Sequence, residues 1–125
     1  MIHTPSRLRQ AKDFRNLLID GFTPTDIDFA YDKDARQFVF GELKVDGTQV
    51  PEGQMRMLKG LSWALASGGR QACILVASHN TLPTEDIDVG NLLVVESWHT
   101  SQDILVPGRY VGRTVSKACD DFFKG

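Results

Sequence analysis

The feature that most constrains the fold is the nearly continuous apolar run from Gln71 to Ser78. Such a run is too short to cross a membrane and has the composition of a strand that is buried on both faces. Gly68 and Gly69 precede it, as expected where a helix has just ended. The run therefore predicts an inner strand of a sheet that is covered on both sides.

The rest of the chain predicts helices and strands in alternation. Apolar residues recur at helical spacing over 6–18, over 54–67 and over a last amphipathic segment marked by Val115, Ala118, Cys119, Phe122 and Phe123. Strand patterns cover 25–31, 37–45 and 91–98. This order predicts an α/β fold with a mixed β-sheet flanked by helices. Because no repeat or linker-like segment interrupts the pattern, we expect a single domain over 1–125.

Composition narrows the class of protein. The chain has 125 residues, of which 42% are hydrophobic and 24% charged, which is ordinary for a globular protein. No apolar run approaches the ~20 residues of a membrane span, so we expect no membrane partner. Cys73 and Cys119 are far apart in sequence and predict reduced, buried thiols in a cytoplasmic protein. The net charge of −2 is less basic than is usual for nucleic-acid-binding domains, although positive charge can still be local.

Charged residues on the strands expected over 25–31 and 37–45 indicate a chemical function. Glu42 and Lys44 are two residues apart on one strand and therefore project from the same face. A three-residue turn at 34–36 would place Asp28 directly opposite Glu42, whereas a register shifted by two would pair Asp26 with Glu42. Cross-strand neighbours have Cβ atoms ~5 Å apart, close enough for two carboxylates to share one cation.

Unpaired charges near a core are costly, which makes a structural role for these residues unattractive. A hard divalent cation between the carboxylates would explain them, because Mg²⁺ takes one or two carboxylates and completes its shell with water and phosphate. Such a cation would polarise a phosphate, and Lys44 would orient the attacking water or offset charge that develops at phosphorus. The pattern predicts phosphodiester hydrolysis with Mg²⁺ or Mn²⁺.

Three stretches together resemble the PD-(D/E)xK nuclease superfamily, in a small phage or prophage branch. These are Thr-Pro-Thr-Asp-Ile-Asp over 23–28, Phe-Gly-Glu-Leu-Lys over 40–44 and Gly-Gln-Met-Arg over 53–56. The resemblance implies a restriction-endonuclease-like core and a metal-dependent DNA nuclease. It implies DNA as partner, a phage- or prophage-encoded cytoplasmic protein and a homodimer. The site residues that it implies are Asp28 and Glu42 as metal ligands, with Asp26 as the alternative ligand, Lys44 as the residue that assists the water, and Gln54 as support.

Two other readings stay open. The first is a non-catalytic nucleic-acid-binding or assembly module of the same fold, which the intact Asp28, Glu42 and Lys44 argue against. The second is a structural protein in which these three residues form a surface ion-pair cluster, which would contribute little to stability. Transition-metal chemistry is not expected, because His3, His79 and His99 lack the spacing of a zinc site.

Overall fold

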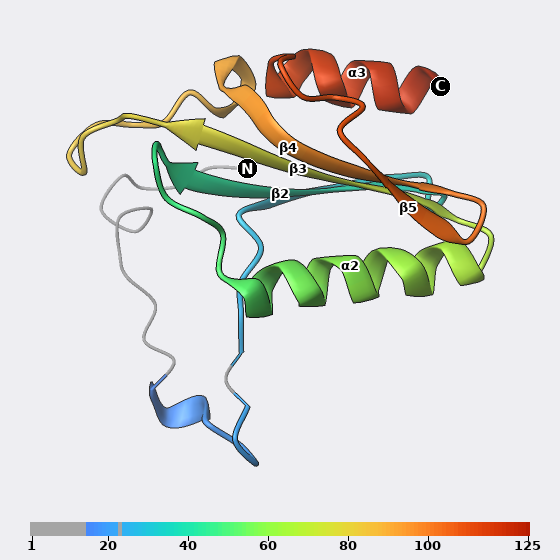
Figure 1. The fold of residues 1–125 in the computed structure, drawn as a ribbon, viewed down its shortest axis with the longest axis horizontal. Helices are drawn as coiled ribbons and strands as arrows, with labels where there is room; N and C mark the ends of the chain where they lie inside the picture. The colour runs from blue at the N-terminus through green and yellow to red at the C-terminus, as the bar shows by residue number, and fades with distance from the viewer. Residues whose placement is uncertain (1–14, 23) are drawn as a thin grey trace.

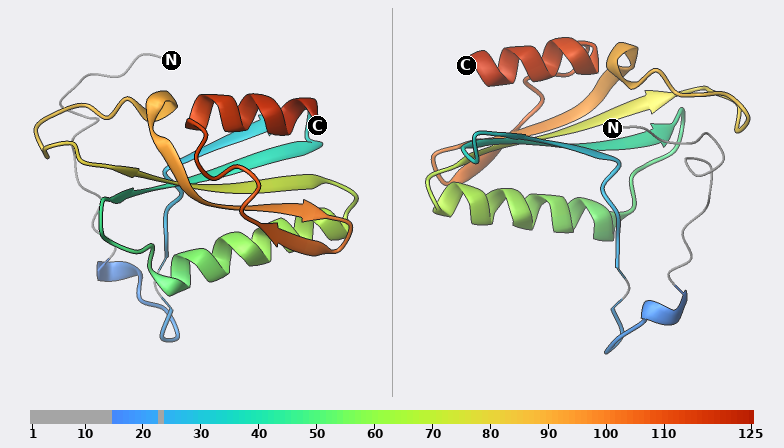
Figure 2. Two further views of the ribbon diagram at one scale, coloured as in Figure 1. Left: turned by 45° about the horizontal axis from the view of Figure 1, so that its top comes forward. Right: turned by 180° about the vertical axis from the view of Figure 1, so that it is seen from behind.

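The computed structural model describes residues 15–22 and 24–125, and its centre is a five-stranded sheet between two helices (Figure 1). Helices α2 and α3 cover opposite faces of the sheet, which gives three layers (Figure 2). The strands are β1 (Phe29–Lys33), β2 (Gln37–Val45), β3 (Gln71–His79), β4 (Leu93–Ser101) and β5 (Ile104–Pro107). The helices are α2 (Glu52–Ser67) and α3 (Val115–Lys124), with short 3-10 turns η1 (Arg15–Leu17) and η2 (Val89–Asn91).

The sheet has the order β1-β2-β3-β4-β5 and is mixed. The neighbouring strands β2 and β3 are parallel, and α2 makes the crossover between them, as a parallel connection requires. The remaining neighbours are antiparallel. These observations confirm the predicted α/β class with a mixed sheet flanked by helices. Within the described part of the chain, no helix is long and apolar enough to span a membrane.

The predicted inner strand is β3, whose residues from Ala72 to Ala77 are all fully buried. Alternate side chains of this strand enter two different hydrophobic clusters. Cys73, Leu75 and Ala77 pack with α3, whereas Ala72 and Ile74 pack with α2. The apolar run therefore gives the sheet two buried faces, and each face is closed by one helix.

Both helices follow their predicted apolar stripes. Helix α2 begins two residues before the predicted start, and Leu58, Leu61 and Leu65 pack in its cluster against the sheet. Helix α3 buries Val115, Ala118, Cys119 and Phe122, and the Thr114 side chain caps it by accepting a hydrogen bond from the Lys117 N–H.

The start of β1 differs from the prediction. The strand begins at Phe29 instead of residue 25, so Asp26 and Asp28 precede it. A strand over the whole of 25–31 predicts that Ile27 and Phe29 share one face, and this is wrong, because Ile27 packs in the α2 cluster and Phe29 in the α3 cluster. The physical reason is local: the Asp28 carboxylate accepts a hydrogen bond from the Leu43 N–H at 2.6 Å, so a side chain replaces the backbone ladder at this point.

Two further boundaries also differ. Strand β4 covers Leu93–Ser101 instead of 91–98, and β5 was not predicted. Most of the helix expected over 6–18 lies outside the described residues. Its described end is the 3-10 turn η1, followed by a small bridge between Ile19 and Phe22, and this segment lies away from the sheet (Figure 2).

The β1–β2 hairpin fixes the geometry of the candidate site. Its three-residue connection, 34–36, places Phe29 opposite Gly41, and the first of the two predicted registers is therefore the one observed. A Cβ atom added at Gly41 would lie 1.9 Å from the Phe29 ring. The ring therefore occupies the space that a side chain at position 41 would need, which ties the two strands in this register.

We expect Gly41→Ala to lower the free energy of unfolding by about 1–3 kcal/mol, because the methyl group displaces the Phe29 ring. Denaturant unfolding checks this, with Gly60→Ala as the control. Gly60 lies in α2 with no atom within 4 Å of an added Cβ, so that variant should gain about 0.5–1 kcal/mol from helix propensity. Equal effects of the two substitutions would contradict the role given to Phe29.

Candidate functional site

The register of the hairpin brings Asp28 and Glu42 together. Phe29 pairs with Gly41, so the next position along the two strands sets Asp28 opposite Glu42. The Asp28 side chain is exposed and is held by the Leu43 N–H, whereas Glu42 is only 3% exposed. The pair therefore consists of a buried carboxylate and a carboxylate at the solvent boundary, on adjacent chain segments.

Glu42 is electrostatically unsatisfied. Its Oε1 atom is buried and has no hydrogen-bond partner. The pKa of Glu42 is raised to about 7, mainly by burial and additionally by the negative charges of Asp28 and Asp26. A hydrogen bond from the Asp28 backbone opposes this change in pKa. A buried acceptor of this kind costs stability unless something positive meets it.

The two carboxylates considered for pairing with Glu42 are not equivalent. Asp28 is the residue opposite Glu42, and its carboxylate is fixed by a hydrogen bond. Asp26 is exposed, and its negative charge raises the pKa of Glu42 less than burial and the charge of Asp28 do. The geometry therefore favours Asp28 over Asp26 as the closer partner of Glu42.

Lys44 lies two residues beyond Glu42 on β2, on the same face of the sheet. Its ammonium group donates a hydrogen bond to the Thr48 carbonyl oxygen in the loop between β2 and α2. Among the described residues, Lys44 and Glu42 form no ion pair. The surface ion-pair cluster considered as an alternative is thus not what the structure contains, since Glu42 is buried and Lys44 is bound elsewhere.

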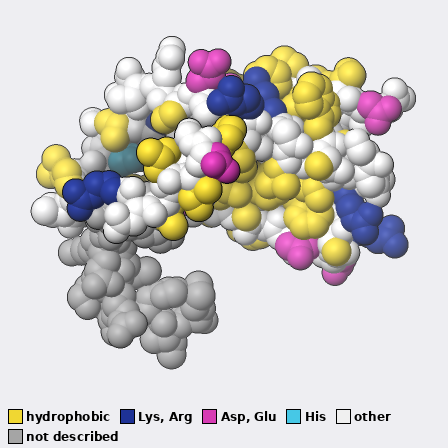
Figure 3. Space-filling model, turned by 90° about the horizontal axis from the view of Figure 1, so that it is seen from below, with side chains coloured by type: hydrophobic (Ala, Val, Ile, Leu, Met, Phe, Trp, Pro, Cys, Tyr) yellow, Lys and Arg dark blue, Asp and Glu magenta, His cyan; other side chains and the backbone are white. Residues whose placement is uncertain are grey.

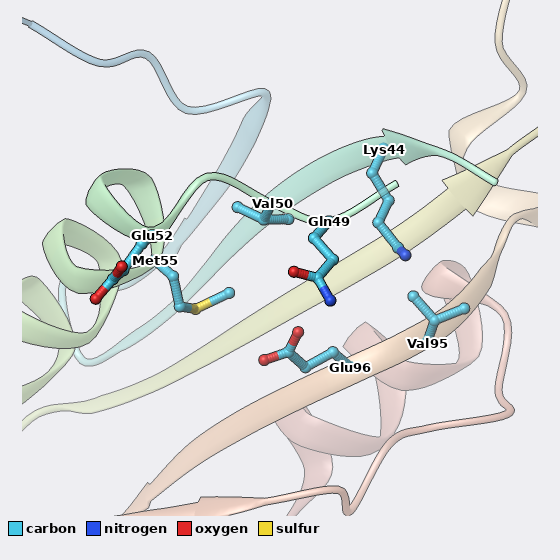
Figure 4. Close-up of a pocket in the computed structure, with 7 residues that line it drawn as sticks. All are labelled: Lys44, Gln49, Val50, Glu52, Met55, Val95 and Glu96. Atoms are coloured by element: carbon cyan, nitrogen blue, oxygen red, sulfur yellow. The ribbon is translucent and has the colours of Figure 1, made fainter. Parts of the chain in front are cut away.

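A pocket of about 560 Å³ opens beside Lys44 on the α2 side of the sheet (Figure 4). Its polar residues come from four elements: Lys44 from β2, Gln49 from the following loop, Glu52 from α2 and Glu96 from β4. Figure 4 shows the amide of Gln49 and the carboxylate of Glu96 directed into the same space. The remaining lining residues are Val50, Met55 and Val95.

The sequence did not predict a role for Glu96. In the sheet, Glu42 lies beside Val76, and Val76 lies beside Glu96, so the two glutamates stand in one row across three strands. The register shift in the β3–β4 pairing follows at the next position, and bulges of this kind redirect side chains. The Trp98 indole N–H donates to Glu96 Oε2 at 2.9 Å and holds its carboxylate in place. A charged residue directly after the apolar run over 92–95 was the available signal.

Gln54 occupies the first turn of α2 and is half-buried. It stands at the N-terminal end of the stripe that Leu58, Leu61 and Leu65 form against the sheet. It is not among the residues that line the pocket, whereas Glu52 and Met55 of the same turn are. The structure therefore places Gln54 at the correct end of the helix but does not bring its side chain into this pocket.

The donor set can be tested against the expected cation. The described residues contain no group of three His, Cys, Asp or Glu side chains arranged to hold a metal ion. This argues against a closed structural zinc site. Mg²⁺ and Mn²⁺ differ, because a Mg²⁺ site typically uses one or two carboxylates and leaves positions for water and phosphate. Asp28 and Glu42, with the unpartnered Oε1 of Glu42, fit that requirement.

Figure 3 shows part of the surface on the α2 side. Among the described residues visible there, lysine and arginine side chains stand in separate groups, with hydrophobic side chains gathered between them.

No protein-family model, curated protein or solved structure matches this chain.

The raised pKa of Glu42 predicts a pH dependence of stability. The unfolded chain loses this proton near the ordinary value of 4.5, and the folded chain near 7. Without divalent cations, the stability that depends on Glu42 should be constant below about pH 4.5, fall as the pH rises to about 7, and then stay constant. Glu42→Gln should remove this fall, a difference of up to about 3 kcal/mol.

Denaturant unfolding of both proteins across this pH range measures the effect. Glu85→Gln is the matched control, because Glu85 is an exposed loop residue whose Oε1 accepts the Leu82 N–H. It should keep the wild-type profile. Parallel pH profiles for wild type and Glu42→Gln would show that Glu42 has an ordinary pKa in the folded protein.

Proposed function

We propose that this protein is a metal-dependent nuclease that hydrolyses DNA phosphodiester bonds with Mg²⁺ or Mn²⁺. The observation that carries the proposal is the buried Glu42 carboxylate, whose Oε1 has no partner and which stands opposite Asp28. Two adjacent carboxylates without a neutralising side chain are destabilising by themselves, and a divalent cation would remove that cost.

Asp28 and Glu42 would hold the cation, and Asp26 would add negative charge nearby. When bound, the cation would supply positive charge to the phosphoryl group under attack. In the reaction, a water oxygen forms a bond to phosphorus and one P–O ester bond breaks. The water gives up one proton to solvent, and the leaving alkoxide takes one up. Glu42 must be deprotonated to bind a cation, so cation binding should become tighter as the pH rises through about 7.

Lys44 supports the same chemistry from the neighbouring position on β2. Its ammonium group lines the pocket and is bound to the Thr48 carbonyl oxygen, an uncharged partner that an anionic phosphate can replace. Released from that carbonyl, Lys44 would orient the attacking water or offset charge at phosphorus.

The competing function is a non-catalytic nucleic-acid-binding or assembly module of the same fold. No feature of the described residues favours it over catalysis, since Asp28, Glu42 and Lys44 are all present at the site. A homodimer, a cytoplasmic location and a phage or prophage origin stay expectations from the resemblance, and the proposed chemistry does not depend on them.

Cleavage assays test the proposal. Labelled linear duplex, circular single-stranded and branched DNA would be incubated with Mg²⁺, Mn²⁺ or EDTA. We expect metal-dependent cleavage by wild type and a loss of about a hundredfold or more in Glu42→Gln, Asp28→Asn and Lys44→Met, because each removes charge that acts on the phosphate. Asp26→Asn should have a smaller effect, since Asp26 is not opposite Glu42.

Lys44→Met should keep cation binding while it loses cleavage, which separates the role of the lysine from that of the carboxylates. Glu85→Gln should behave as wild type. Absence of cleavage of every substrate by wild type, together with Mn²⁺ binding that survives Glu42→Gln, would reject the nuclease and favour the binding module.

A further inference from the structure

The pocket beside Lys44 combines features that a phosphate does not require. Val50 and Met55 contribute apolar groups from the α2 side, and Val95 contributes one from β4 (Figure 4). Lys44 and Glu52 also line it, and two further polar groups point into it: the amide of Gln49 and the carboxylate of Glu96, which the Trp98 indole N–H holds in place. Apolar walls with a few convergent polar groups are typical of a site for a small, flat organic group.

The charge in the pocket argues against a second phosphate as its occupant. Glu96 and Glu52 both line the space and would repel an anion. A nucleobase differs, because its faces are apolar and its edge carries hydrogen-bonding groups. The volume of about 560 Å³ lies in the range of small-molecule pockets and would accept one base with its sugar.

Glu96 is organised to accept a hydrogen bond. The Trp98 indole N–H binds its Oε2 atom, and the Lys59 ammonium lies 3.7 Å from the centroid of the Trp98 ring. Trp98 itself packs in the α2 cluster, so the core holds the indole ring that fixes the Glu96 carboxylate. A carboxylate accepts hydrogen bonds and does not donate them, and its known partner among base edges is an exocyclic amino group such as N4 of cytosine.

The pocket also has the correct position relative to the carboxylate pair. Glu42 and Glu96 are separated by the single strand β3, that is by two strand spacings or roughly 10 Å. Lys44 lies at both places, because it follows Glu42 on β2 and lines the pocket. A phosphate at Asp28 and Glu42 and a base near Glu96 would therefore belong to one nucleotide or to two consecutive ones.

We propose that this pocket binds one unpaired nucleobase that carries an exocyclic amino group, with Glu96 accepting from that amino group and Gln49 donating to the adjacent ring nitrogen or carbonyl. The inference builds on the proposed nuclease function and adds its substrate class, which is single-stranded or locally unpaired DNA. In a duplex the Watson–Crick edge is occupied, so the base must leave the stack before it can enter.

Binding of short single strands tests the pocket without any dependence on cleavage. Fluorescein-labelled strands of dC and of dU, equal in length, differ at the base edge in two groups: cytosine has an amino group and an acceptor N3 where uracil has a carbonyl oxygen and an N3–H donor. Fluorescence anisotropy in EDTA measures their affinities for the full chain. We expect wild type to bind dC about tenfold more tightly than dU.

Glu96→Gln should lower the ratio of the dC affinity to the dU affinity, because a neutral amide oxygen accepts a weaker hydrogen bond than a carboxylate, while Glu85→Gln should leave the ratio unchanged. The ratio cancels the general gain in affinity that loss of a negative charge gives. Equal affinities in wild type, no binding of either strand, or a dC preference that is undiminished in Glu96→Gln would each overturn the inference. Binding without cleavage would count against the nuclease alone, so the two proposals fail in distinguishable ways.

Discussion

The position of Glu42 is the constraint on which the account of this protein depends. The residue lies on β2 between a fully buried strand and the hairpin partner β1, and its Oε1 atom meets no donor. The charged residues that raise its pKa, Asp28 and Asp26, are negative as well. Folding therefore concentrates like charge at a buried point, and the low dielectric there makes the cost larger than at the surface. Such a cost is understandable where a cation is to be bound.

The rest of the fold determines what can reach that point. The parallel pairing of β2 and β3 requires a crossover, and the crossover loop and helix α2 bring Gln49 and Met55 beside Lys44. Strand β4 adds Glu96 from the other side, next to a register shift in its pairing with β3. The site is thus assembled from one hairpin, one loop, one helix end and one strand that are separate in sequence. The site has carboxylates at two places, the Asp28 and Glu42 pair and the pocket with Glu96. Lys44 follows Glu42 on β2 and also lines that pocket.

Much of this arrangement could be predicted from the sequence, because it follows from periodicity and turn length. The apolar run of β3 and the stripe of Leu58, Leu61 and Leu65 indicated the covered sheet, and the three-residue turn indicated that Asp28 stands opposite Glu42. The start of β1 could not be predicted, since it depends on a side-chain hydrogen bond from Leu43 to Asp28. Glu96 was missed because its neighbours come from strands that are adjacent only after folding.

Isothermal titration calorimetry with Mn²⁺ tests the central claim most directly. Wild type and Glu42→Gln would be titrated near pH 7 in two buffers with different ionisation enthalpies, which reveals protons released on binding. The account predicts a single Mn²⁺ site per chain in wild type, with proton release on binding because burial raises the pKa of Glu42 to about 7. It predicts that Glu42→Gln loses both the site and the proton release. Mn²⁺ binding of equal affinity in both proteins, or no binding by wild type, would contradict it.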